Sequence, residues 1–157
     1  MLNGAFTDML TGQAPMIVPR LRRVLFWSDP DQVLDFTSKD DTARTTAHVA
    51  LDALAPRAVE VSGDRVTARG LARTMTDVTG EDHRVQWAGT AGTLSVMARA
   101  MRATSKDATS AFPAWQGMQY FVSMFSGQAE LRHVDNDRYG HHDWTTTRDV
   151  LAAHFGR

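Results

Sequence analysis

The amino-acid sequence predicts a mixed fold, α/β or α+β, in a single domain that spans residues 1–157. The first observation is length, because 157 residues are typical of one domain and enough to bury a core. The second is composition, since 43% of the residues are hydrophobic and 22% are charged, close to globular averages. The third is patterning, because short strand-like runs alternate with about five segments of helical spacing.

The first forty residues predict a short helix and a hairpin. Residues 6–11 fit a short helix that Gly12 would end, since glycine readily adopts the backbone conformation found after helices. Residues 24–27 and 33–37 have strand-like composition. The segment 28–31 between them favours a turn, because its proline presets the backbone angle of the second turn position. We therefore expect the two strands to pair as a hairpin.

The next part of the chain predicts a helix and a strand. A helix over residues 40–54 has Asp40 or Asp41 available as its N-cap. Residues 59–62 then predict a strand. The helix carries apolar residues at helical spacing. These are Ala43, Ala47, Ala50, Leu51 and Leu54.

Two further helices and a strand follow. Thr67 can cap a helix that Gly80 would end. Residues 84–87 have strand-like composition, and residues 93–104 fit another helix. A polar loop at residues 104–107 comes next. The alternation of strands and helices is typical of an α/β or α+β domain rather than a helical bundle.

The fourth long helix is apolar on nearly all sides. Pro113 would open it, it ends before Gly127, and Thr145 can cap one last helix beyond it. A helix of this kind is buried on both faces, lines a pocket, or contacts another subunit. We interpret it as the wall of an apolar ligand pocket, because aromatic and methionine side chains adapt to flat ligands. The predicted pocket residues are Trp115, Met118, Phe121 and Met124, with Phe26, Trp27 and Met101 as additions.

Charge and residue usage exclude several classes of protein. The formal net charge of −1 gives no reason to expect nucleic acid or a membrane surface as a partner. The longest apolar runs have about four residues, whereas a helix that spans a membrane needs ~20 apolar residues. The N-terminus lacks the basic region and the long apolar stretch of a signal peptide. We therefore expect a cytoplasmic protein. The absence of cysteine excludes disulfides, thiolate catalysis and Cys-ligated metals. The preference for arginine over lysine is typical of a GC-rich bacterial genome.

Motifs of common enzyme classes are missing or incomplete. The turn at residues 89–92 lies between a strand and a helix, but it has two of the three glycines of a dinucleotide-binding loop. Neither tyrosine is followed four residues later by the lysine that would lower its pKa in a short-chain reductase. His141 and His142 are adjacent and point in different directions, which disfavours a metal site. We therefore expect neither a cofactor nor a metal.

Three stretches of the sequence resemble a known family. They are Asn-Gly-Ala-Phe-Thr-Asp-Met-Leu at 3–10, Leu-Asp-Phe-Thr-Ser-Lys-Asp-Asp-Thr-Ala at 34–43 and Val-Glu-Val-Ser-Gly-Asp at 59–64. They resemble the C-terminal half of the NmrA-like, isoflavone-reductase-like branch of atypical short-chain dehydrogenases. Asp41 and Ala43 match a motif that leads into a helix, and Ser62, Gly63 and Thr67 match a strand-and-turn motif.

This resemblance implies a truncated Rossmann-type protein that lacks its nucleotide-binding half. In the family, the N-terminal half carries the glycine loop, the cofactor contacts and the catalytic residues, and no stretch of this chain corresponds to it. The resemblance therefore implies the half that encloses small, often aromatic substrates, without an NAD(P) site. Fold similarity alone does not imply a reaction.

Three functions remain open from the sequence. The first is a protein that binds an apolar or aromatic metabolite and catalyses a cofactor-free biosynthetic step, such as cyclisation, isomerisation or dehydration. Its candidate acids and bases are Asp41, His48, Asp8 and His133, although Asp41 also fits a helix cap. The second is an interaction or regulatory subunit whose apolar faces are covered by a second copy of itself, as a homodimer, or by a Rossmann-type partner chain. The third is a fragment of an NAD(P)-dependent reductase.

Overall fold

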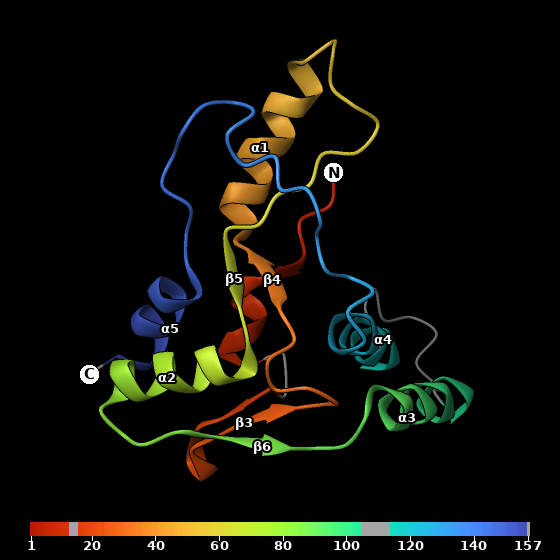
Figure 1. Ribbon diagram of the computed structural model, residues 1–157, viewed down its shortest axis with the longest axis vertical. Helices are drawn as coiled ribbons and strands as arrows, with labels where there is room; N and C mark the ends of the chain where they lie inside the picture. Colours follow the sequence, from red (N-terminus) through yellow and green to blue (C-terminus); the bar gives the residue numbers. More distant parts are fainter. Residues whose placement is uncertain (13–15, 105–113, 157) are drawn as a thin grey trace.

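The computed structural model describes residues 1–12, 16–104 and 114–156, and these residues form the mixed α/β fold that the sequence predicts. Within these ranges, six short strands form two small sheets, and five α-helices pack around them (Figure 1). One end of the molecule contains α2, α3, β3 and β6, and α1 extends toward the other end. Pro113 and positions 105–107 of the predicted polar loop lie outside the described residues.

Each sheet has three strands and contains both parallel and antiparallel pairs. The first sheet has the order β1-β4-β5, in which β4 pairs in parallel with β1 and antiparallel with β5. The second has the order β2-β3-β6, in which β3 pairs antiparallel with β2 and in parallel with β6. The strands are Ala5–Phe6 (β1), Ile17–Val18 (β2), Arg23–Phe26 (β3), Leu34–Thr37 (β4), Asp64–Val66 (β5) and Arg84–Trp87 (β6).

The predicted hairpin between residues 24–27 and 33–37 is wrong, because β3 and β4 belong to different sheets. The turn between them does form, and the backbone N–H of Asp31 donates to Oδ1 of Asp29 at 2.8 Å. Every residue of β4 is buried, so this strand requires partners and cover on both sides. β4 obtains its partners from β1 and β5, and β3 pairs with β6 from much later in the chain.

The strand predicted at residues 59–62 is also wrong. The segment makes one isolated parallel bridge, between Glu60 and Leu2, and the regular strand β5 begins only at Asp64. Side chains from the end of the chain take the backbone groups that a strand would use. The N–H of Glu60 donates to Asp135 Oδ2 at 2.9 Å, and the N–H of Ser62 donates to Asn136 Oδ1 at 3.1 Å.

The helices begin and end largely where local signals predict them. Thr67 caps α2, where its hydroxyl accepts the N–H of Gly70, and Gly80 ends that helix with φ of 72° as predicted. The N-cap of α1 is Ser38 and not the predicted Asp40 or Asp41. The N-cap of α5 is Thr146 and not the predicted Thr145. The helices are Lys39–Leu51 (α1), Ala68–Thr79 (α2), Ala91–Thr104 (α3), Ala114–Phe125 (α4) and Thr147–Phe155 (α5), with short 3₁₀ helices at Thr7–Thr11 and Pro19–Leu21.

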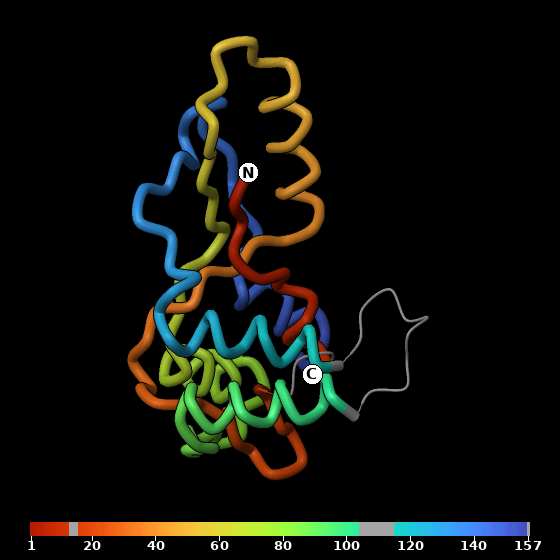
Figure 2. The backbone as a smooth tube through the Cα atoms, turned by 90° about the vertical axis from the view of Figure 1, so that its right-hand side faces the viewer, coloured from red at the N-terminus to blue at the C-terminus, as the bar shows by residue number. Residues whose placement is uncertain are grey.

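The hydrophobic core lies where α2 packs against α5 and β3, and it continues toward α3 and α4. Leu71 and Met75 of α2 are fully buried, as are Val24 of β3 and Leu151 of α5. Figure 2 shows α3 and α4 side by side, and α1 separate from both. Burying one face of each amphipathic element in this way is the main source of the fold's stability.

Candidate ligand pocket

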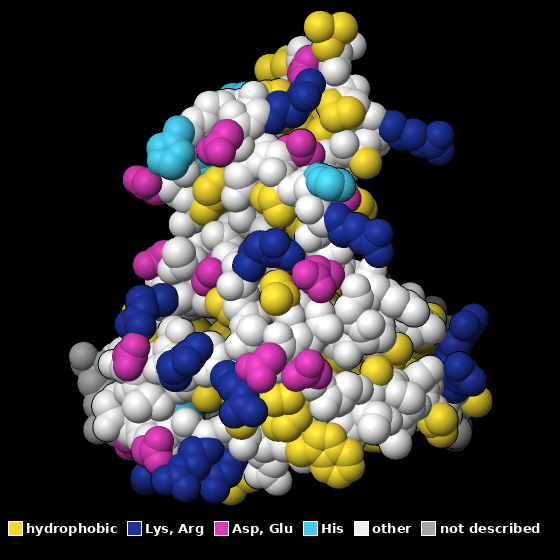
Figure 3. Space-filling view, viewed as in Figure 1, with side chains coloured by type: hydrophobic (Ala, Val, Ile, Leu, Met, Phe, Trp, Pro, Cys, Tyr) yellow, Lys and Arg dark blue, Asp and Glu magenta, His cyan; other side chains and the backbone are white. Residues whose placement is uncertain are grey.

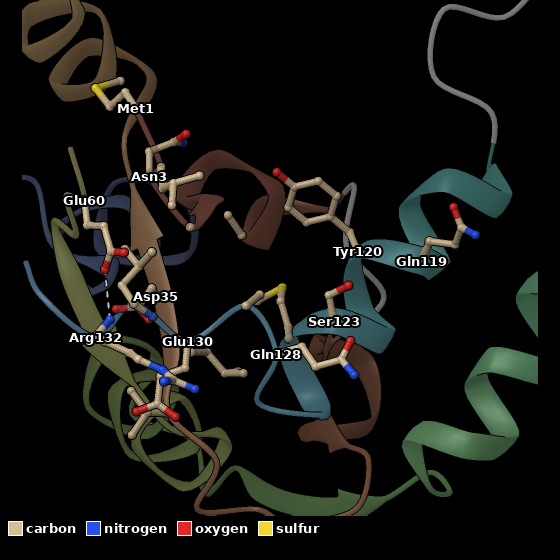
Figure 4. A pocket seen from close by; sticks show the side chains of 18 of the residues that line it. Met1, Asn3, Asp35, Glu60, Gln119, Tyr120, Ser123, Gln128, Glu130 and Arg132 are labelled. Atoms are coloured by element: carbon tan, nitrogen blue, oxygen red, sulfur yellow. Dashed lines mark hydrogen bonds between the residues drawn. The ribbon is translucent and has the colours of Figure 1, made fainter. Parts of the chain in front are cut away.

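A pocket of about 780 Å³ lies between α4 and the sheet that contains β4 (Figure 4). One wall is α4, and the opposite wall is the N-terminal segment 1–5 together with residues 33–35. Residues 128–132, which follow α4, and Glu60 complete the lining. The volume is within the range of small-molecule sites, which are concave, mostly apolar and few per protein.

α4 presents both aromatic and polar side chains to the pocket. Gln116, Tyr120 and Ser123 follow one another at helical spacing on one side of α4, with Trp115 and Met124 beside them in the lining. Figure 4 shows Tyr120 projecting from α4 toward the N-terminal segment that carries Asn3. The opposite side of α4 packs into the core and against α3.

Six lining side chains carry neutral hydrogen-bonding groups: Asn3, Gln116, Gln119, Tyr120, Ser123 and Gln128. Within the described part of the chain, none of these side chains makes a hydrogen bond to another residue. Their donors and acceptors are therefore available to a ligand. Small-molecule sites combine apolar walls with polar groups that fix the ligand's orientation, and the lining of this pocket offers both.

Two carboxylates hold the wall that follows α4. The buried Asp35 of β4 accepts the Nε–H of Arg65 through Oδ1 and the backbone N–H of Leu131 through Oδ2, both at 2.9 Å. Glu60 accepts the N–H groups of Arg132 and His133 through Oε2 at 2.9 Å and 3.1 Å (Figure 4). Three successive backbone donors are thus satisfied by acidic side chains. Asp35 and Glu60 therefore build the pocket wall.

Gly4 lets the N-terminal segment approach β4 at the pocket. Its φ is +62°, in the left-handed region that favours glycine. A Cβ atom at this position would overlap the backbone carbonyl of Asp35. A larger residue would therefore push the N-terminal wall of the pocket away from β4.

Two of the predicted pocket residues, Trp115 and Met124, line this pocket. Trp27 and Phe121 are buried against each other and against Phe125, with ring centroids 5.2–6.3 Å apart, so they form an aromatic core.

The other predicted residues are also outside the lining. Phe26 and Met118 are partly buried against the core, and Met101 is exposed on α3. The side chains of α4 could be assigned to a core side and a pocket side only with the positions of α3 and β4, which are set by distant parts of the chain.

Asp41, the first candidate acid, has a structural role at the N-terminal end of α1. Its side chain is buried and accepts the hydroxyl of Ser38 at 2.7 Å, the N–H of Thr145 at 2.9 Å and the Arg44 guanidinium at 3.0 Å. Burial raises the pKa of Asp41, but the hydrogen bonds from Thr145 and Ser38, together with the charge of Arg44, lower it below its ordinary value on balance. The Asp41 carboxylate therefore joins α1 to the segment before α5.

We expect Asp41→Asn to lower the free energy of unfolding by about 1–2 kcal/mol at pH 7, because it removes a charged acceptor of three hydrogen bonds. The lowered pKa means that Asp41 is less protonated in the native state than in the unfolded chain at pH values around the two pKa values. This stabilisation is therefore complete above the unfolded value near 3.8 and is lost as the pH falls through the lower folded value. Urea denaturation at pH 7 and pH 3 checks this, and a difference from wild type that is equal at both pH values would contradict it.

The other candidate acids and bases lie apart from one another. His48 is exposed on α1 and stacks on Tyr139 with ring centroids 5.7 Å apart. Asp8 makes an ion pair of 3.4 Å with Lys39. His133 is exposed, and its backbone N–H bonds to Glu60. None of the four candidates, Asp41 included, is among the described residues that line the pocket.

The turn between β6 and α3 does not fit a dinucleotide phosphate. The N–H of Thr90 donates to Thr93 Oγ1, the N–H of Thr93 donates to Thr90 Oγ1, and the N–H of Ala91 donates to Ser28 Oγ, at 2.9–3.1 Å. A phosphate at a helix N-terminus needs these same donors. Gly89 with φ of 133° packs closely on Thr93 and Trp27. The glycines of this turn therefore serve local packing and capping.

The described residues contain no cluster of three or more His, Asp or Glu side chains placed to hold a metal ion. The His141–His142 turn contributes a contact between the rings of His142 and Trp144, whose centroids are 4.3 Å apart.

Within the same described ranges, no helix has both the length and the apolar character needed to cross a membrane.

Sequence reasoning missed the polar side of the pocket. The signal was present, because Gln116, Tyr120 and Ser123 recur at i, i+4 and i+7 within a helix that is otherwise apolar. Asp35 and Glu60 gave no such signal, since the backbone groups that they bind lie more than 70 residues away in sequence.

No protein-family model and no curated protein matches the chain. Among solved structures, the chain is similar to a nucleoside-diphosphate-sugar epimerase from Staphylococcus aureus, with a TM-score of 0.64 and 14% identity over 95% of this chain and 50% of that one. It is also similar to AtPrR2 in its apo form, with a TM-score of 0.67 and 15% identity over 97% of this chain and 52% of the other. The chain thus spans about half the length of each. At these identities the similarity shows the fold, which is the epimerase-like α/β fold.

Proposed function

We propose that the protein binds a small apolar or aromatic molecule in the pocket between α4 and β4. The observation that carries the proposal is the lining itself. Trp115, Tyr120 and Met124 offer apolar and aromatic contact, and neutral side chains around them have free hydrogen-bonding groups. The resemblance to the substrate-pocket half of NmrA-like dehydrogenases and the epimerase-like fold both support this proposal.

The pocket supports binding better than acid–base catalysis. Both oxygens of Asp35 are engaged, one by Arg65 and one by Leu131. Glu60 holds two backbone donors through one oxygen, and Glu130 contacts Arg65 and Gln32. A carboxyl group that acts as a general acid or base must be able to exchange its proton with the substrate. Cyclisation, isomerisation or dehydration therefore has less support than ligand binding. Tyr120 and Ser123 are lining residues whose hydroxyl groups make no hydrogen bond within the described residues.

We expect Trp115→Ala to abolish most of the thermal stabilisation that a ligand gives. The experiment screens the full chain by thermal shift against flat aromatic ketones, phenols and carboxylic acids, with NADPH as a separate arm. A bound ligand raises the melting temperature because it stabilises only the native state. Removing an aromatic wall is expected to weaken binding about 10–100-fold, the effect of losing a buried aromatic anchor.

Trp144→Ala is the matched control, because Trp144 contacts His142 and is outside the pocket lining. It should leave the ligand-induced shift unchanged. Stabilisation by NADPH with a dissociation constant below about 10 μM would contradict our expectation that the chain binds no nucleotide cofactor. A panel in which no aromatic compound binds wild type, or in which both tryptophan variants lose binding equally, would overturn the proposal.

A further inference from the structure

The lining of the pocket between α4 and β4 carries more acidic than basic side chains. Three of the described lining residues are acidic and one, Arg132, is basic. The acidic residues are Asp35, Glu60 and Glu130. Arg65, which is outside the lining, makes ion pairs with Asp35 at 2.9 Å and with Glu130 at 3.4 Å. Glu60 has no such partner in the described part of the chain, so no neighbouring side chain of these ranges neutralises its negative charge.

Glu60 is held in place through its backbone and through one carboxylate oxygen. Its N–H donates to Asp135 Oδ2 at 2.9 Å, and its carbonyl accepts the N–H of Asp135 at 2.6 Å. Oε2 accepts the N–H groups of Arg132 and His133. The other oxygen, Oε1, accepts no hydrogen bond from a described residue. Glu60 therefore offers the pocket an acceptor that is already fixed, and a ligand that binds it need not order the side chain first.

Glu60 and α4 lie on opposite sides of the pocket. Figure 4 shows Glu60 on the same side as Asn3, and Tyr120 projecting from α4 on the other side. The Asn3 amide has no hydrogen-bond partner in the described ranges, so its oxygen is a second acceptor on the Glu60 side. Figure 3 shows the molecule hollowed between the end that carries α1 and the end that carries α4. The two walls thus offer a ligand different chemistry, with oxygen acceptors on one side and aromatic rings on the other.

The α4 side of the pocket already has a positive charge beside it. The guanidinium carbon of Arg102, on α3, lies 5.0 Å from the centre of the Trp115 ring. Arg102 is exposed and outside the lining. Because like charges repel and opposite charges attract, a cationic group of a ligand is favoured at Glu60 rather than at Trp115. An aromatic ring of the same ligand is then placed to stack on the α4 wall.

We propose that the ligand of this pocket is an aromatic compound with a protonated amine, whose ring contacts α4 and whose ammonium group binds Glu60 Oε1. This inference rests on the proposed function, because it names the ligand class of the same pocket. An ammonium group has three N–H donors, of which Glu60 and Asn3 can accept two. Hydrogen bonds of ionised groups are about twice as strong as those of neutral groups. A ligand with a carboxylate in this position would instead meet the like charge of Glu60.

Three compounds with the same ring and different charge test the ligand class. They are tryptamine, which is cationic, tryptophol, which is neutral, and indolepropionate, which is anionic. Titration calorimetry on the full chain at pH 7 should show that tryptamine binds about tenfold more tightly than tryptophol. Indolepropionate should bind more weakly than either, because its carboxylate meets Glu60. Raising the salt concentration from about 20 mM to about 300 mM should weaken tryptamine binding and leave tryptophol binding unchanged, because salt screens the ion pair.

Glu60→Gln removes the charge and keeps an oxygen that can accept the N–H groups of Arg132 and His133. We expect tryptamine affinity to fall about tenfold while tryptophol affinity stays within about threefold, so the preference for the amine disappears. Damage to the wall would weaken both compounds equally and leave that preference in place. Glu81→Gln is the matched control, because Glu81 pairs with Arg22 at 3.2 Å and is outside the lining. It should keep the wild-type ratio of the two affinities.

The outcomes separate the ligand class from the proposed function. Equal binding of tryptamine and tryptophol by wild type, or a Glu60→Gln variant that keeps the preference, would overturn the ligand class and leave the pocket as a site for aromatic molecules. Failure of all three compounds to bind wild type at up to about 5 mM would overturn both. If Glu60→Gln does not fold, the wild-type ratio and its salt dependence decide the question alone.

Discussion

Replacing Asp35 with alanine is expected to lower the free energy of unfolding by about 2–4 kcal/mol, the largest effect of any single polar substitution in the pocket wall. The Asp35 side chain is 1% exposed, and its two oxygens accept donors from Arg65 and Leu131. Its removal leaves the N–H of Leu131 without an acceptor in a buried position. It also removes the ion-pair partner of the Arg65 guanidinium, but this group is partly exposed and can turn toward water.

The same substitution should release the wall that follows α4, so ligand binding should fall together with stability. Urea denaturation at pH 7 measures the first effect, and thermal shift with a bound aromatic ligand measures the second. Asp31→Ala is the matched control, since Asp31 also pairs with an arginine, Arg69, but both side chains are more than half exposed. It should cost no more than about 0.5 kcal/mol. Equal losses in the two variants would show that Asp35 has no special structural role.

Gly4→Ala is expected to cost about 2–3 kcal/mol, because a left-handed backbone and a steric overlap coincide at this residue. The φ of +62° alone costs an alanine about 1 kcal/mol. The added Cβ would also overlap the backbone carbonyl of Asp35, which β4 holds in the sheet. The N-terminal segment must therefore move outward, and the pocket between it and α4 should widen.

Gly80→Ala separates the two contributions to this loss. Gly80 ends α2 with φ of +72°, and a Cβ there would meet nothing within 4 Å. This variant should lose only the conformational part, about 1 kcal/mol. Both free energies come from urea denaturation, with aromatic-ligand affinity as a second readout that only Gly4→Ala should change. If the two variants lose equal stability and both bind ligand normally, the N-terminal segment does not set the pocket width.

Elements with local determinants could be predicted from the sequence. The start and end of α2 depend on Thr67 and Gly80, whose effects act within one helical turn. The alternation of short strands and helices likewise gave the mixed α/β fold. The predictions of the hairpin and of the strand at 59–62 failed because distant residues determine the partners. β3 pairs with β6 and not with β4. The backbone N–H groups of residues 60 and 62 donate to the side chains of Asp135 and Asn136.

The candidate site was predictable only in part for the same reason. Trp115 and Met124 could be recognised as wall material from residue type and helical spacing. The assignment of Trp27 and Phe121 to the core instead of the pocket depends on how α3 and α4 pack, which no local pattern encodes. Asp41 has the residue type of a catalytic acid, but the partner that fixes its role, Thr145, is 104 positions away.

The hydrogen bonds that build the pocket wall also determine when the pocket can form. Asp35 and Leu131 are 96 positions apart, and Glu60 and Arg132 are 72 apart. A chain that emerges from the ribosome N-terminus first exposes β4 and Glu60 long before their partners exist, because synthesis adds about 5–20 residues per second. Contacts of such high sequence separation also slow folding, since a long loop must close before they stabilise anything. Ligand binding is therefore expected to be the last property that a newly made chain acquires, after α2 and its local contacts are in place.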